Sequence, residues 1–280
     1  MIAANVLFRR STMTISPEEL GSLRDSLRGL LGTSKPDVAP TPDPGWKARW
    51  PALADLGVLA LCASEEVGGF GNEVVAALLV SRELGAALHG SPFAASVAAT
   101  YAVTRWVQPA ERRTELANAI LSGAHIPVLA LLEPGSSIAG DGELRVNGRA
   151  RLVPGVDDCD SFLLVAPDRD TMTFVPQTDR CAADSVQTFD VTRSCADVVF
   201  RDATALPLRS TAADRDRTER LHGLLLAGDA IGGVELMLDR TTAYALGRKA
   251  FGKVIGGFQA VQHRLVDHAL WVRGASLVVS

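Results

Sequence analysis

The spacing of hydrophobic positions divides the chain into a helical part, a part with short strands and a second helical part. After Ser16, a proline, two acids and leucines at helical spacing predict a helix from about Pro17 to Leu31. Helical periodicity returns between Trp50 and Leu121, where glycines interrupt it. Between Thr33 and Trp46 the chain has four prolines and few apolar side chains, which indicates a linker or surface loop.

From His125 to Leu206 the pattern changes to short β-branched or alternating runs separated by turn dipeptides. The predicted strands are Ile126–Leu132, Glu143–Val146, Ser161–Val165, Met172–Val175 and Asp197–Phe200. The predicted turns are Asp141-Gly142, Asn147-Gly148 and Pro154-Gly155, of which the second is a strong hairpin signal. This part is therefore predicted to be a small antiparallel β domain.

After Pro207 the helical period predicts one long helix from about Arg217 to Arg248, a break at Gly252–Gly257 and a second helix from near Phe258. The order of elements predicts an α+β fold. We expect an N-terminal helical domain at 1–124, a middle β domain at 125–208 and the beginning of a C-terminal helical domain at 209–280.

Composition excludes several functional classes. The chain has 280 residues, 47% of them hydrophobic, and a net charge of −4 without a block of like charge, so we expect no nucleic-acid or membrane partner. The apolar tract Leu224–Leu238 is too short and too charged to span a bilayer. No secretory segment is visible, and the four cysteines lack metal-ligand spacing, so we expect a cytoplasmic, reduced protein without a metal; Met13 is an alternative start to Met1.

Several local motifs occur along the chain in a defined order. They are Ser64–Gly71 (SEEVGGFG), Arg82–Gly85 (RELG), Glu133–Ser136 (EPGS), Val146–Arg149 (VNGR) and the stretch Arg248–Lys253 (RKAFGK) with Phe258, Gln259 and His263. Taken singly, each is also typical of an ordinary turn or packing site. In this order and spacing they resemble the acyl-CoA dehydrogenase family, and the resemblance covers almost the whole chain from Trp50 onward.

The resemblance implies a flavin enzyme that oxidises the α,β bond of an acyl-CoA thioester. In such enzymes a carboxylate removes the α-proton while the β-hydrogen leaves as hydride to FAD. The arginine of the Arg248 motif would reach the pyrophosphate of an FAD bound mainly by a neighbouring subunit, because a guanidinium offers paired donors to phosphate oxygens. The implied cofactor-binding residues are Arg248, Lys249, Phe251, Phe258 and Gln259. A solvated cationic helix end is the alternative interpretation.

The β domain departs from the family pattern. The family's Trp-Ile-Thr element, which lies against the flavin ring, falls at Leu152-Val153-Pro154, and Leu132 replaces a common threonine. The segment from Ser136 to Gly142 leads almost directly into the next predicted strand, which predicts that a strand of the family is deleted here. These changes predict that the chain's own β domain is a poor flavin site.

The catalytic base also differs. One family position for the glutamate, a late loop, would lie beyond Ser280, and at the other position this chain has His222. Glu219, one helical turn earlier, is the remaining carboxylate candidate for the catalytic residue, although a shift of one turn moves a side chain by roughly 4–5 Å. A packing or capping role is the alternative for both residues.

These observations favour a subunit that has lost part of its own site and assembles with a paralogous acyl-CoA dehydrogenase subunit, as in heterotetrameric actinobacterial steroid-degrading members of the family. The implied partners also include an acyl-CoA substrate and an electron-transfer flavoprotein. Two alternatives stay open. One is a self-sufficient homo-oligomeric dehydrogenase with its base at Glu219 or beyond the C-terminus, and the other is a non-enzymatic scaffold or truncated relic.

Overall fold

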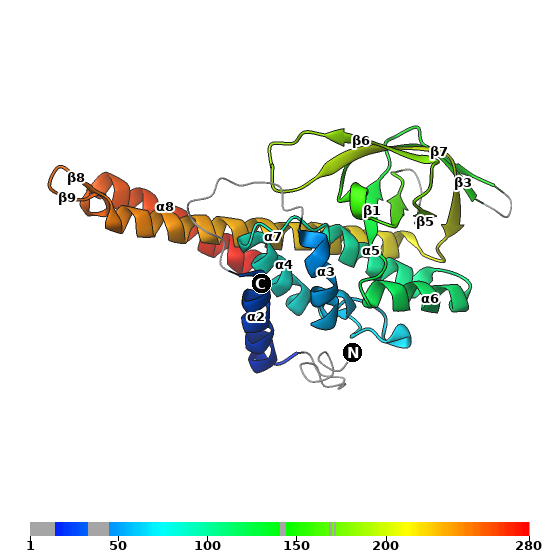
Figure 1. The fold of residues 1–280 in the computed structure, drawn as a ribbon, viewed down its shortest axis with the longest axis horizontal. Coiled ribbons are helices and arrows are strands. Elements are labelled where there is room, and N and C mark those ends of the chain that lie inside the picture. The colour runs from blue at the N-terminus through cyan, green and yellow to red at the C-terminus, as the bar shows by residue number, and fades with distance from the viewer. Residues whose placement is uncertain (1–14, 33–44, 141–143, 168–169, 171, 280) are drawn as a thin grey trace.

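The computed structural model describes residues 15–32, 45–140, 144–167, 170 and 172–279. The chain forms a helical layer, a sheet beside it, and a long helix that runs along the helical layer and out to a distant tip (Figure 1). The N-terminal helices are α2 (Pro17–Leu31), α3 (Trp46–Asp55), α4 (Val74–Ala86), α5 (Phe93–Trp106) and α6 (Ala110–Leu121).

Helix α2 has the limits that the sequence predicts. Its capping box is complete: the Ser16 N–H donates to Glu19 Oε2 at 2.9 Å, and the Glu19 N–H donates to Ser16 Oγ at 3.3 Å. Leu23 and Leu27 are fully buried on the face toward α4. Most of the predicted loop at 33–46 lies outside the described residues, and Trp46 begins α3.

The middle of the chain forms one mixed sheet. Its strands are β1 (Pro127–Leu131), β2 (Ser137–Ala139), β3 (Leu144–Pro154), β4 (Ser161–Val165), β5 (Thr173–Pro176), β6 (Cys181–Val186) and β7 (Cys195–Pro207). The strand order is β1-β4-β5-β7-β3-β2, with β6 also paired to β7. The prediction of a wholly antiparallel domain is wrong for β1 and β4, which pair in parallel because the chain builds β2 and β3 elsewhere in the sheet before it returns.

Two turn predictions in the sheet have different outcomes. Asn147-Gly148 is not a hairpin: it lies inside β3, at an irregularity between Val146 and Gly148, and Gly148 pairs with Phe200. A Cβ at Gly148 would collide with Ser136, so the glycine serves close packing rather than a turn. The turn at Pro154-Gly155 is confirmed, since Gly155 has φ 65° at the end of β3.

The segment predicted to be deleted is present as a short strand. Within 136–142, the residues of β2 pair with β3, with Ile138 opposite Val146. The dipeptide Asp141-Gly142 lies outside the described residues.

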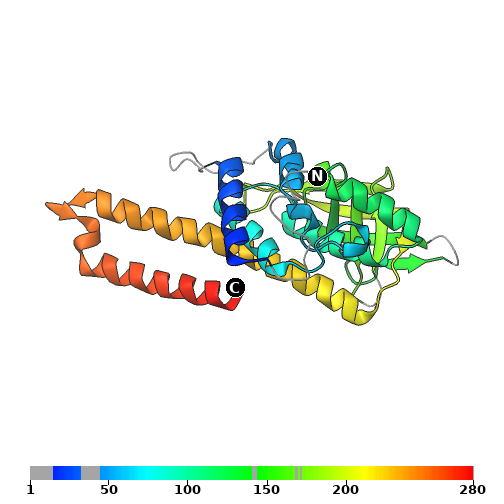
Figure 2. The same cartoon turned by 90° about the horizontal axis from the view of Figure 1, so that it is seen from below.

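The C-terminal part consists of α7 (Ala212–Gly247), a small hairpin of β8 (Lys249–Ala250) and β9 (Lys253–Val254), and α8 (Gln259–Val279). Helix α7 begins five residues before the predicted start because Thr211 and Asp214 form a capping box. It packs on α4 and α5, then continues outward beside α8, which folds back toward the body (Figures 1 and 2). We call residues 238–279 the arm.

Glycines let α7 lie directly against α4. A Cβ at Gly232 would collide with the carbonyl oxygen of Arg82, and one at Gly85 would collide with that of Asp229. Nearby, Glu235 accepts hydrogen bonds from Arg82 Nη2 and from Ser276 Oγ, both at 2.6 Å, and so joins α4, α7 and α8. Within the described residues, α7 has the length and composition to cross a membrane, a weak indication because core helices pass the same test.

Candidate functional site

A small cavity lies where the helical layer, the edge of the sheet and α7 meet. Its volume is about 40 Å³. It is lined from the α4–α5 connection by His89, Ser91 and Pro92, from the end of β3 by Pro154, from the loop before β7 by Arg193, and from α7 by His222, Leu226 and Asp229. The structure thus brings together His222, at the predicted base position, and Pro154, at the predicted flavin-facing position. We call this space the central cavity.

The two histidines of the central cavity are buried to different degrees. His89 is 3% exposed, and its Nδ1 lies 2.8 Å from Ser91 Oγ. Burial lowers the pKa of His222 below the ordinary value of 6.5. The neutral imidazole is therefore the favoured form of His222 at neutral pH; its free ring nitrogen can accept a proton, but the lowered pKa makes it a weaker base than an ordinary histidine.

An ion pair crosses the same region from the loop before β7 to α7. Arg193 Nη1 lies 2.7 Å from Asp229 Oδ2, and Nη2 donates to Asp229 Oδ1 at 2.8 Å. Burial by itself would lower the pKa of Arg193, but the hydrogen bond and charge of Asp229 outweigh it and raise the pKa above its ordinary value. Sequence reasoning missed this pair, because a lone arginine in a loop carries no pattern that points to α7.

Glu219 does not line the central cavity. Its Oε1 lies 3.2 Å from Arg215 Nε, one turn earlier on α7, and its side chain is 40% exposed. Among the described residues that line the cavity, Asp229 has the one carboxylate, and Arg193 binds both of its oxygens. The role of Glu219 as a catalytic base stays a prediction.

The five predicted cofactor-binding residues lie together at the far end of the arm (Figure 1). Arg248 ends α7, and its carbonyl accepts a 2.8 Å hydrogen bond from the Ile255 N–H, which closes the hairpin. Lys249 belongs to β8, and Gln259 begins α8. We call residues 248–259 the hairpin tip.

Aromatic rings and cations alternate at the hairpin tip. Phe251 is 96% exposed at the turn, with φ 50°. Its ring meets that of Phe258 edge to face at 6.3 Å, and Lys253 Nζ lies 4.3 Å from the centre of the Phe258 ring. The Arg248 side chain is exposed, and Lys249 and Lys253 are exposed beside it. This set of exposed cationic donors suits a pyrophosphate group.

The chain's own sheet does not suit a flavin ring at the corresponding place. The Leu152 N–H already donates to Asp197 Oδ1 at 3.0 Å, and Pro154 has no N–H. Asp197 also accepts from Arg149, and its pKa is lowered, first by the hydrogen bond from Leu152 and then by Arg149. Backbone donors that could face a flavin in this segment are thus satisfied internally or absent.

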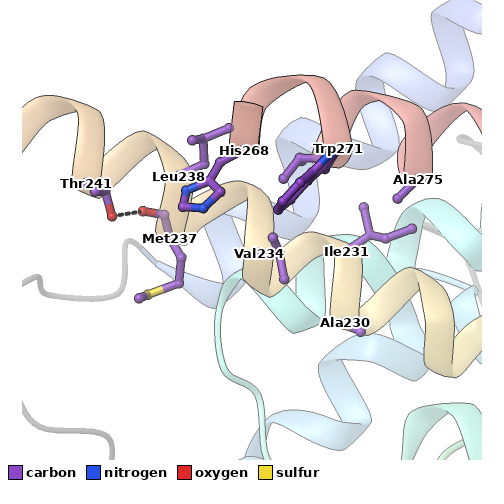
Figure 3. A pocket seen from close by; sticks show the side chains of 10 residues that line it. Ala230, Ile231, Val234, Met237, Leu238, Thr241, His268, Trp271 and Ala275 are labelled. Carbon is purple, nitrogen blue, oxygen red and sulfur yellow. Dashed lines mark hydrogen bonds between the residues drawn. The ribbon is translucent and has the colours of Figure 1, made fainter. Parts of the chain in front are cut away.

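An apolar groove of about 480 Å³ runs between α7 and α8 at the base of the arm (Figure 3). Trp271 lies across it from Val234 and Ile231, and Met237 and His268 lie toward its outer end (Figure 3). Trp271 is 72% exposed and Met237 is 62% exposed. An exposed apolar surface of this kind is typical of a contact with other protein segments.

The comparisons with known proteins agree with the fold. The family model for the N-terminal domain of acyl-CoA dehydrogenases matches residues 17–123, and the model for their C-terminal domain matches residues 220–280. The acyl-CoA dehydrogenase IpdE2 of Mycobacterium tuberculosis is 31% identical over 271 residues, which cover 94% of this chain and 75% of that protein. IpdE2 of Mycolicibacterium smegmatis is 32% identical over 231 residues, 82% of this chain and 64% of that protein.

Solved structures show the same fold. The ChsE4-ChsE5 complex from Mycobacterium tuberculosis matches with a TM-score of 0.80 and 25% identity, over 96% of this chain and 77% of that one. A variant of the Tcur3481-Tcur3483 steroid acyl-CoA dehydrogenase matches with a TM-score of 0.79 and 22% identity, over 94% and 76%. The chain therefore belongs to the acyl-CoA dehydrogenase family, whose cofactor is FAD.

Proposed function

We propose that this chain is one subunit of a heteromeric acyl-CoA dehydrogenase and that its hairpin tip binds the pyrophosphate of an FAD held mainly by a paralogous subunit. The observation that carries the proposal is the separation of two features. The exposed cations of the hairpin tip lie at the end of the arm, away from the chain's own sheet (Figure 1). In that sheet, the Leu152 N–H donates a hydrogen bond to Asp197 and is therefore not available to a flavin.

The α,β-dehydrogenation of an acyl-CoA thioester needs a carboxylate base, and FAD supplies the electron-accepting ring when bound. This chain has His222 at the base position, while Asp229 and Glu219 are each bound by an arginine. We therefore assign the base to the partner subunit. This chain supplies Arg248, whose guanidinium would donate hydrogen bonds to the phosphates of the cofactor, with Lys249 and Gln259 beside it.

Relatives supply the class of partner and substrate. One similar structure is a complex of two differently named chains, and another is described as a steroid acyl-CoA dehydrogenase. By analogy we propose a paralogous dehydrogenase subunit as partner, a steroid-derived acyl-CoA as substrate class and an electron-transfer flavoprotein as electron acceptor. The apolar groove at the base of the arm is consistent with assembly, since Trp271 is largely exposed there in the single chain.

The test is to purify this chain through an affinity tag, with and without a co-expressed paralogous subunit, and to measure flavin absorbance per chain and oxidation of acyl-CoA. We expect flavin and activity only in the co-purified complex. A yellow, active product from this chain alone would instead support a self-sufficient homo-oligomer. A partner that gains neither flavin nor solubility from this chain would support a non-enzymatic scaffold.

A further inference from the structure

The central cavity is too small for a substrate. Its 40 Å³ hold about one water molecule, whereas sites for small molecules measure about 300–1,000 Å³. This space includes the position at which the family places a base on the helix, here His222. The question is whether a ligand could enlarge the cavity or whether the surrounding packing keeps it closed.

Helix α7 closes one side. Gly85 on α4 lies against the backbone of Asp229, and Gly232 lies against the backbone of Arg82, so a Cβ at either glycine would collide with a main-chain carbonyl. Helices in direct backbone contact leave no space for an acyl chain between them. The cavity therefore cannot extend between α4 and α7 without separating the two helices.

The sheet closes the opposite side. A Cβ at Gly155, just after β3, would lie 2.8 Å from the ring of Pro92, so this turn rests on the beginning of α5. Between these contacts, the bidentate pair of Arg193 and Asp229 ties the loop before β7 to α7. The pair is about four-fifths buried, with side-chain exposures of 22% and 18%, and breaking it would leave a charge without its partner in a poorly solvated place.

We propose that Arg193 and Asp229 are the lock that keeps this chain's own thioester site shut, so that the complex takes acyl-CoA at the partner's site alone. The inference rests on the proposed function for the existence of the complex, but the closure is a property of this chain. It assigns a specificity role to two residues that contact neither cofactor nor substrate. They act by excluding a ligand from the surroundings of His222.

The first test counts ligands on the complex. An α,β-unsaturated acyl-CoA, the product class of the proposed reaction, is titrated calorimetrically into the purified complex, and flavin absorbance is recorded on the same sample. We expect one acyl-CoA for each pair of subunits. Two acyl-CoA molecules for each pair would overturn the lock, whereas a complex without flavin would contradict the proposed function and leave the count of acyl-CoA as a separate result.

The second test probes access to the site without any ligand. His222→Cys places a thiol in the central cavity, while Arg220→Cys and Arg217→Cys place one at side chains that are 83% and 67% exposed on the same helix. Labelling by a maleimide is followed for each peptide by mass spectrometry. We expect Cys at 222 to react about tenfold more slowly than the two controls, because position 222 is only partly exposed and faces the central cavity.

Removal of the ion pair between Arg193 and Asp229 should abolish the difference in labelling rate between position 222 and the controls. Arg193→Ala/Asp229→Ala deletes both charges together, so no unpaired ion stays buried. In this background we expect the thiol at 222 to react at a rate near that of the controls. Equal rates at 222 and 220 with the lock intact would overturn the proposal. The comparison of positions 222 and 220 with the ion pair intact also tests the proposal if the double variant does not fold.

Discussion

Helix α7 belongs to both the body of the molecule and the arm, and its surroundings differ between the two. Where α7 crosses the body, glycines bring it into backbone contact with α4, and Asp229 is held by Arg193. Beyond Leu238, α7 and α8 have large apolar side chains in solvent and end in an exposed cationic tip. The difference agrees with the proposed function, in which the body of this subunit takes no ligand and the arm contacts the cofactor and the partner.

A large loss of stability is expected from a substitution in the body that separates α4 from α7. Gly232→Ala should destabilise the chain by about 3 kcal/mol or more, because the new Cβ meets the main chain of Arg82 and cannot be relieved by a side-chain rotation. Gly223→Ala is the control: it lies on the same helix with nothing within 4 Å of an added Cβ, and it should stabilise by about 0.5–1 kcal/mol. Unfolding in urea measures both. Shifts of the same sign would show that the helices are not in contact.

Two tryptophans compare the body with the arm directly. Trp50 is 1% exposed in the helical layer, so Trp50→Ala should cost about 3–5 kcal/mol. Trp271 is 72% exposed on the arm, so Trp271→Ala should change the stability of the isolated chain by less than about 1 kcal/mol. Thermal unfolding of the chain alone gives both values. A large loss at Trp271 would mean that the arm is part of the chain's own core.

The hairpin tip is tested through the cofactor. Arg248→Ala should weaken FAD binding by the complex about tenfold or more, which corresponds to the loss of about 1.5–3 kcal/mol from charge-assisted hydrogen bonds. Arg248→Lys should recover part of the affinity because it keeps the charge but not the paired donors. Flavin retained after gel filtration is the measurement, and Arg264→Ala, exposed on α8, is the control. An unchanged flavin content in Arg248→Ala would contradict the proposed contact.

The features that the sequence predicts well are local ones. The limits of α2 follow from Ser16, Pro17 and Glu19, whose capping geometry needs no distant partner. The break between the two C-terminal helices is likewise predicted from the short stretch Gly252–Gly257, and the structure ends α7 at Gly247 and begins α8 at Gln259. Both features can be predicted because the residues that form the sequence pattern are the same few residues that form the structure.

The features that sequence reasoning missed depend on distant contacts. Arg193 and Asp229, 36 residues apart in sequence, are paired because the loop before β7 reaches α7. Asn147-Gly148 is a hairpin signal by type, but its backbone pairs with β7, and the glycine admits Ser136 instead of forming a turn. The parallel pair of β1 and β4 depends on the path of the whole sheet, which strand periodicity does not contain.

A smaller effect is expected from pH on the closed body. Burial lowers the pKa of His222 in the folded chain, so above its ordinary pKa of 6.5 the residue is mostly neutral in both states and has little effect on stability. As the pH falls below that value, the unfolded chain takes up the proton more readily, and the folded state loses stability. His222→Gln should make this loss shallower between about pH 7 and pH 5, measured by thermal unfolding. His125 has a lowered pKa for the same reason, so the slope should fall but not vanish.

The exposed His263 supplies the matched control, because its ring lies near Gln259 at the hairpin tip rather than in the central cavity. His263→Gln should leave the acid slope as it is. An unchanged slope in His222→Gln would contradict the burial of that ring in neutral form, and with it the closure of the central cavity.

The smallest expected effect concerns Glu219, and it separates the two enzymatic hypotheses. If the partner supplies the base, Glu219→Gln should leave the kcat of the complex within about twofold, because removing a base from the reaction itself typically costs about 10²-fold or more. The half-exposed ion pair with Arg215 has little to contribute to stability, so folding should not obscure the result. A kcat lower by about 10²-fold, with flavin content unchanged, would place the base on this chain. In that case the central cavity would have to open during turnover to bring Glu219 to the thioester. The ion pair of Arg193 and Asp229 would then break and re-form in each catalytic cycle instead of excluding the substrate permanently.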